Sequence, residues 1–170
     1  SSDLVRSVAV ALGPRETASH FTLSNLTGQL GTTSSGRFEG ADVLLDAVPL
    51  DVRDASGAWR FVNGRLDLSG ASLRVEDREL DDRFQPLTAE GASLGLADNV
   101  ITAKALLREP KSGRAVAGVD IVHRLASARG HADLAVDGLT FDDKVQPDTL
   151  TTFALGIIAN TRGTVNGTGR

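Results

Sequence analysis

The residues able to carry acid–base or metal chemistry are scattered through this sequence. Its three histidines, His20, His123 and His131, lie in separate runs and lack the spacing of metal ligands. His123 shares its alternating position with Ile121, so it belongs to the apolar side of an expected strand. We interpret all three histidines as structural or rim-exposed side chains.

Acidic residues gather in one short stretch of the chain. Clustered carboxylates favour a hard divalent cation, and this stretch holds Glu76, Asp77, Glu79, Asp81 and Asp82. The spacing is not that of an EF-hand, and we interpret the stretch as a solvated turn. A general acid would need an apolar pocket that raises its pKa, and the sequence around Asp81-Asp82 and Asp142-Asp143 predicts no such pocket.

Signatures of nucleophilic catalysis and phosphate binding are also missing from the sequence. It contains no Gly-x-Ser-x-Gly nucleophile elbow. The glycines of segment 163–169 are followed by neither a helix nor a Lys-Ser/Thr pair, so this segment is not a phosphate-binding loop. We therefore expect no catalytic residue, no metal and no cofactor, and a protein that is not an enzyme.

Composition excludes further classes of function. The formal net charge is −4 and no run of Lys and Arg is interleaved with aromatic residues, which argues against a nucleic-acid partner. No apolar run approaches the ~20 residues that span a bilayer, and no signal peptide opens the chain. Because the sequence has no Met, we expect such segments, and any membrane association, to lie outside this chain. Disulfides are excluded because the sequence contains no cysteine.

Short alternating runs recur about every ten residues and predict strands. The clearest example sets Leu66 and Leu68 against Arg65 and Asp67. Turns are expected at segments rich in Gly, Asn, Asp, Ser or Pro, namely 31–36, 54–57, Asn63-Gly64, Ser69-Gly70, Asp98-Asn99 and 110–113. This spacing suits a sandwich, a barrel or a continuous meander. We expect a mainly β protein with a strongly curved antiparallel meander sheet, forming one domain over residues 1–170 or a section of a longer repetitive protein.

The C-terminal part of the sequence predicts a bent strand and one helix. Alternation over residues 130–141 shifts its parity at Gly138, which predicts a β-bulge. Pro147 suits the first turn of a helix of about residues 147–159. Its apolar stripe would consist of Leu150, Phe153, Ala154, Ile157 and Ile158. We expect this short amphipathic helix to cap the sheet through Leu150, Phe153 and Ile157.

Three strings in this part carry a resemblance to a known family. They are Gly138-Leu139-Thr140-Phe141, Gln146-Pro147-Asp148-Thr149-Leu150 and Gly163-Thr164-Val165-Asn166-Gly167-Thr168-Gly169-Arg170. They resemble the YdbH-like family, a domain also labelled "dicarboxylate transport", which belongs with the AsmA-like proteins of Gram-negative envelopes. The resemblance implies a long β-sheet groove with an apolar inner face. It also implies a periplasmic location, an inner-membrane anchor and a role in phospholipid traffic between two membranes.

This resemblance and the strand pattern together give a functional expectation. Acyl chains of a phospholipid or similar ligand would lie in an apolar groove, whose lining is expected to be Phe21, Leu23, Leu66, Leu68, Leu73, Val75, Ile101, Val119, Ile121, Leu134 and Val136. Burial would contribute about 0.8 kcal/mol per CH₂ removed from water. The alternative is an envelope assembly or scaffold module that binds β-rich partners by adding a strand at an exposed edge. Other envelope proteins are possible partners in both cases.

Overall fold

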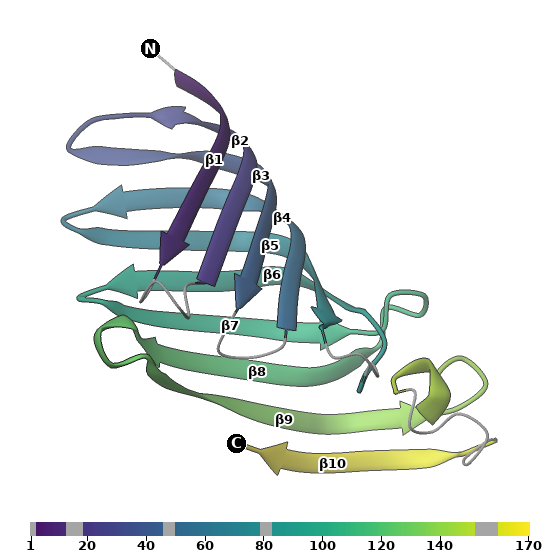
Figure 1. The fold of residues 1–170 in the computed structure, drawn as a ribbon. Helices are drawn as coiled ribbons and strands as arrows, with labels where there is room; N and C mark the ends of the chain where they lie inside the picture. Colours follow the sequence, from purple (N-terminus) through teal and green to yellow (C-terminus); the bar gives the residue numbers. More distant parts are fainter. Residues whose placement is uncertain (1–2, 13–18, 46–49, 79–82, 152–159) are drawn as a thin grey trace.

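The computed structural model describes residues 3–12, 19–45, 50–78, 83–151 and 160–170. These residues form one ten-stranded antiparallel sheet in which each strand pairs with its neighbours in chain order (Figure 1). The strands are β1 (Asp3–Leu12), β2 (Ser19–Gln29), β3 (Thr33–Leu45), β4 (Leu50–Val62), β5 (Arg65–Asp77), β6 (Leu87–Ala97), β7 (Val100–Arg108), β8 (Ala115–Arg124), β9 (Arg129–Phe141) and β10 (Gly163–Gly169). Because β1 does not pair with β10, the sheet is an open meander and neither a barrel nor a sandwich.

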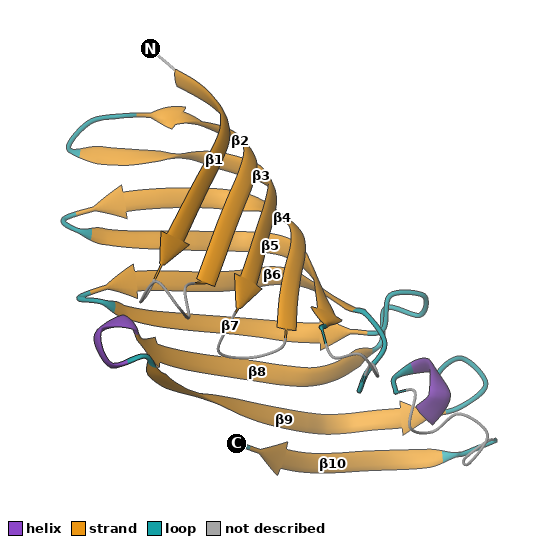
Figure 2. Ribbon diagram, viewed as in Figure 1, coloured by secondary structure: helices purple, strands orange, loops and turns teal. Residues whose placement is uncertain are grey.

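Tight hairpin turns join the strands along one side of the sheet, and the sequence predicts the two described next. Asn63 and Gly64 both have positive φ, as do Asp98 and Asn99, which a type I′ turn requires at its two central positions. We call the side with these two turns and with segments 30–32 and 125–128 the hairpin rim. The opposite side, which carries the longer connections 109–114 and 142–162, is the loop rim (Figure 2).

The expected turns at 31–36, 54–57 and Ser69-Gly70 are wrong in their extent or their nature. β3 already begins at Thr33, and the other two segments lie inside β4 and β5. The reason is a series of β-bulges: Gly40, Asp54, Gly70 and Gly91 have positive φ in the middle of β3, β4, β5 and β6. The pairing register shifts around each of these positions. A residue in this conformation bends a strand as readily as it ends one, so the local sequence does not distinguish the two.

These bulges fold the sheet over on itself. β1, the first halves of β2 and β4 and the last half of β3 run across in front of the later strands, and we call this part the flap (Figure 1). Each bulge residue is followed by a buried alanine, and these four residues, Ala41, Ala55, Ala71 and Ala92, form the crease. Ala41 is 1% exposed. Side chains converge on the inner side of a bend, so methyl groups suit these positions.

Around the crease lies the main hydrophobic core. Leu23, Phe38 and the four crease alanines belong to it, and Trp59 packs against it. The Trp59 indole N–H donates to the Thr27 carbonyl at 3.1 Å. A Cβ at Gly28 would come within 2.5 Å of the Trp59 ring, so glycine is required beneath the indole. Packing therefore ties β2, β3 and β4 together at the bend.

The C-terminal part confirms the predicted bulge but does not support the predicted helix. Gly138 has φ of 67°, and its N–H donates to Asn166 Oδ1 at 2.8 Å, so a side chain of β10 satisfies the donor that the bulge leaves unpaired. Pro147 does begin a helical segment, but it is one 3-10 turn, η2 (Pro147–Thr149), and Thr151 is not helical. The other short turn is η1 (Leu125–Ser127), and Figure 2 shows no longer helix in the described part of the chain. Phe153, Ala154, Ile157 and Ile158 lie outside the described residues.

Candidate functional site

The strand register places all the expected groove residues on one face of the sheet. Residues directly opposite each other on paired strands share a face. One row joins Leu68, Leu94, Ala103, Ile121 and Ala132, and a second joins Leu66, Leu96, Ile101 and His123. Three further rows read Phe21–Val43–Val52–Val75, Leu23–Ala41–Ala55 and Leu73–Ala89–Leu107. Of the remaining expected positions, Val119 pairs with Leu134, and Val136 pairs with Gly167. We call this surface the apolar face.

The expected groove lining omitted several members of the apolar face, among them two leucines of β6 that join its rows. Leu94 and Leu96 on β6 continue the rows between β5 and β7. The alternation of Ala92, Leu94 and Leu96 was the available signal, but Gly91 and Gly95 obscured it. With these two residues the first row is apolar from β5 to β9, and the second is apolar from β5 to β7 and ends at His123 on β8.

Coverage of the apolar face is uneven. Residues that are nearly free of solvent contact lie mainly in β2 to β6, at or near the crease. On β7 to β9 large aliphatic side chains of this face, such as Ile101, Val119 and Ile121, are only half-buried. Leu134 is 42% exposed. The chain therefore leaves part of its own apolar face uncovered on β7 to β9, toward the hairpin rim and the C-terminal edge.

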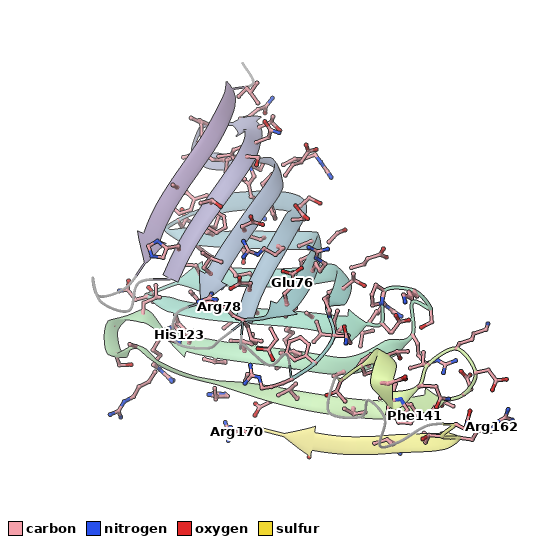
Figure 3. All side chains as sticks on the ribbon, turned by 45° about the vertical axis from the view of Figure 1, so that its right-hand side comes forward. Glu76, Arg78, His123, Phe141, Arg162 and Arg170 are labelled. Carbon is pink, nitrogen blue, oxygen red and sulfur yellow. The ribbon has the colours of Figure 1, made fainter. Side chains whose placement is uncertain are left out.

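The opposite face carries the charged side chains in ion-paired rows. Lys104 Nζ lies 2.7 Å from Asp120 Oδ1, across neighbouring strands. Near the loop rim, the buried carboxylate of Asp51 accepts hydrogen bonds from Arg53 and Arg78. Figure 3 shows Arg78 and Glu76 in this region. This polar face is typical of a surface held in water, and the contrast between the two faces gives the sheet its amphipathic character.

Carboxylates at the loop rim hold the connections in place. Arg114 donates to Asp142 Oδ2 at 2.7 Å, and the backbone N–H groups of Lys144 and Val145 donate to the same carboxylate. These hydrogen bonds hold the pKa of the Asp142 carboxyl well below its usual range. Burial by itself would raise the pKa of Glu109, but hydrogen bonds from Ser112 and the Lys111 amide outweigh burial, and the net shift is downward. Both carboxylates are thus ionised structural acceptors, and their lowered pKa values do not suit a general acid.

Gln146 fixes the connection between β9 and β10. Its side-chain amide donates to the Asp142 carbonyl at 2.6 Å and to the Thr161 carbonyl at 3.0 Å, and its Oε1 accepts from the Thr161 N–H at 2.9 Å. The adjacent Val145 is fully buried. Further along, the Leu150 carbonyl accepts from the Gln85 N–H at 2.8 Å, which joins this connection to the one before β6. The Gln146-Pro147 string therefore has a structural role.

Candidate chemical groups identified in the sequence do not converge in the structure. His20 is exposed, His123 lies on the apolar face, and His131 approaches Asp133 at 3.8 Å on the polar face. Glu76 and Asp77 pair with arginines, whereas Glu79, Asp81 and Asp82 lie outside the described residues. Among the described residues no group of three or more His, Asp or Glu side chains could hold a metal ion.

Two open depressions of about 530 Å³ occur on the surface. One lies over β8 to β10 and includes Asp120, Asp133 and Thr168, and the other lies at the Asn63-Gly64 and Asp98 turns. Both are lined mainly from the polar face and the hairpin rim. The candidate functional surface is therefore the extended apolar face. Neither depression is a candidate.

A comparison with protein-family models gives the chain its family. Residues 5–170 match the YdbH-like model, which is described as intermembrane phospholipid transport protein YdbH. Neither the curated proteins nor the solved structures contain a match. In the part of the chain that is described, no helix has the length and apolarity needed to cross a membrane. Since the match covers nearly the whole chain, well beyond the C-terminal strings that resemble it, the protein belongs to the YdbH-like family.

Proposed function

We propose that this chain is a non-enzymatic, periplasmic section of an intermembrane phospholipid transport protein and that it holds acyl chains on its apolar face. The observation that supports this function is the series of apolar rows across β5 to β8, part of which the flap leaves uncovered. Acyl chains have no polar group to recognise, so contact with such a surface stabilises them through burial alone, at about 0.8 kcal/mol per CH₂. The family description supports phospholipid as the ligand.

The flap and the open sheet suggest how a lipid moves. The flap covers the core near the crease, while the aliphatic rows nearer the hairpin rim stay partly in contact with solvent. Acyl chains would lie along these rows, and head groups would stay in water at the rim. Because neighbouring rows are chemically alike, the acyl chains would slide from strand to strand without a discrete site for hydrocarbon. Attachment to the inner membrane would come from segments outside this chain.

Lipid extraction and native mass spectrometry of the purified protein test this function. We expect co-purifying phospholipid with the wild-type protein and much less with Ile121→Asp, because a charge on this face costs several kcal/mol when hydrocarbon must cover it. The matched control is Thr102→Asp, on the polar face of the neighbouring strand, which should retain lipid. A wild-type protein that is free of lipid after gentle purification from envelope membranes would contradict the proposal.

A scaffold role is the second candidate, because no strand among the described residues pairs with the outer side of β10. Its residues are all exposed and include no charged residue and no proline, the usual features that protect an edge from pairing. Such an edge accepts another strand through main-chain hydrogen bonds. Under this hypothesis, replacing Val165 with Pro would abolish capture of a β-rich partner without changing the lipid content. Under the lipid hypothesis, polar substitutions on the apolar face would instead lower the lipid content.

A further inference from the structure

Arginines are paired differently at the two rims of the sheet. At the loop rim, Arg78, Arg83, Arg114 and Arg162 each lie within ion-pair distance of an aspartate. Figure 3 shows Arg162 near the start of β10 on this side. At the hairpin rim, Arg65 pairs with Asp67, but the side chains of Arg124 and Arg129 have no hydrogen bond or ion pair among the described residues. The fold therefore leaves two guanidinium groups without an anion at the turn between β8 and β9.

The register makes this pair unfavourable for the fold itself. Arg124 and Arg129 lie directly opposite each other as the last paired residues before the turn, and both are exposed. Like charges in directly opposed positions destabilise a sheet. The partner of Arg124 on its other side is Val100, which supplies no compensating charge. β10 ends opposite Leu134 and so does not reach Arg129.

The apolar face ends beside this pair with an imidazole. His123 pairs with Ile101 and with Gly130, the residues next to Val100 and Arg129. A Cβ at residue 130 would lie 2.8 Å from His123 Nδ1, so glycine leaves the space that the imidazole occupies. Ile121 and Leu134, half-buried and exposed respectively, lie further along the same face on the same two strands. His123 and Gly130 are thus each one residue from an arginine, Ile121 is three residues from Arg124, and by alternation both arginines lie on the opposite, polar face at the ends of β8 and β9.

We infer that Arg124 and Arg129 bind the phosphate of the head group of a lipid whose acyl chains lie on the apolar face. This inference rests on the proposed function and adds which polar group is recognised and where. A guanidinium donates two parallel hydrogen bonds to a phosphate, and two opposed guanidinium groups are stabilised when one anion lies between them. Both arginines start from the polar face, so this proposal requires their long side chains to extend past the β8–β9 turn toward the apolar face, which their place at the strand ends allows. His123 adds a third donor at the boundary.

Photo-crosslinking with two lipids tests this inference. The probes are a photoactivatable phosphatidylglycerol and the diacylglycerol with the same acyl chains, each presented in micelles of a nonionic detergent. We expect the wild-type protein to capture the phospholipid about tenfold better than the diacylglycerol, as hydrogen bonds to a charged group imply. The Arg124→Gln/Arg129→Gln variant should capture both equally, with unchanged diacylglycerol capture.

A matched control removes two other cations. Arg37→Gln/Lys111→Gln changes the net charge by the same amount at exposed side chains away from the β8–β9 turn, and it should keep the wild-type ratio. Thermal unfolding of the Arg124 and Arg129 variant checks the fold, and we expect an equal or higher Tm because like-charge repulsion is removed. An unchanged capture ratio in this variant would overturn the inference while leaving the proposed function standing. Failure of the wild-type protein to capture either lipid would overturn both.

Inorganic phosphate distinguishes a lipid phosphate from a free one. Excess phosphate should reduce capture of phosphatidylglycerol and leave capture of diacylglycerol unchanged, because it competes for the two guanidinium groups alone. If phosphate binds at Arg124 and Arg129, as detected by their side-chain NMR signals, without reducing phospholipid capture, the pair is a site for free anions and the inference is wrong.

Discussion

Enlarging one alanine of the crease should destabilise the whole sheet. Ala41 is 1% exposed and lies between Leu23 and Ala55 in register, so Ala41→Leu adds three carbon atoms where no space is left. Overpacking of this kind costs about 1–3 kcal/mol. For a chain of this length, each kcal/mol lowers Tm by about 2–4 °C, so we expect a decrease of about 2–12 °C in thermal unfolding followed by circular dichroism.

Two further variants show whether the crease is the cause. Ala135→Leu makes the same substitution at an exposed position on the polar face of β9, and it should change stability by no more than about 0.5 kcal/mol. The exchange Leu23→Ala/Ala41→Leu conserves volume across one register pair, so its Tm should be higher than the two single effects predict. An unchanged or increased Tm for Ala41→Leu would mean that the bend is not closely packed, and the reasoning would fail.

Three other predictions concern the C-terminal part. Asn166→Ala removes the acceptor of the Gly138 N–H, so hydrogen exchange at Gly138 should accelerate, with a stability loss of about 0.5–1.5 kcal/mol, while Thr168→Ala leaves that amide unchanged. Gln146→Ala removes three hydrogen bonds and should increase exchange over residues 142–151, whereas Gln85→Ala, which keeps its backbone bond to Leu150, should not. The pKa of the Asp142 carboxyl is lowered in the folded protein, so its contribution to stability is present above the ordinary carboxyl pKa of about 4. This contribution is lost as pH falls through the lowered value. The Tm difference between wild type and Arg114→Gln should therefore shrink in strong acid.

Much of the sheet could be predicted from the sequence because period-two alternation depends directly on which face is buried. The same alternation places Leu66, Ile101 and Ile121 on one face without knowledge of the register, and the structure places them there. The hairpin at Asn63-Gly64 was predictable because few dipeptides adopt positive φ at both positions.

The bend of the sheet could not be predicted in the same way. Asp54 and Gly70 have the conformation of turn residues, and only their strand partners decide that the chain continues in β4 and β5. A signal was nevertheless present: Gly40, Gly70 and Gly91 are each followed by alanine, as is Asp54, at the middle of successive strands. A single dipeptide of this kind is not informative, but three Gly-Ala dipeptides and one Asp-Ala at the middle of four consecutive strands predict a crease.

The predicted helix is not supported, because its described part is a single 3-10 turn. Pro147 and Asp148 are favourable at the start of any helical turn, and the structure does begin one there. Gln146 uses its side chain to hold Thr161, which anchors this connection to the start of β10 and gives the Gln-Pro string a purpose other than helix initiation. The sequence does not predict the opposed positions of Arg124 and Arg129, because these depend on the strand register.

Site-specific photo-crosslinking to lipid tests the central claim most directly. A photoactivatable amino acid would replace Ile121 or Leu134 on the apolar face and, in matched variants, Asp120 or Asp133 on the polar face of the same strands. If acyl chains lie on the apolar face, the first pair should capture phospholipid in cells and the second pair should not. Equal capture from both faces would contradict the assignment of the apolar face as the lipid-binding surface.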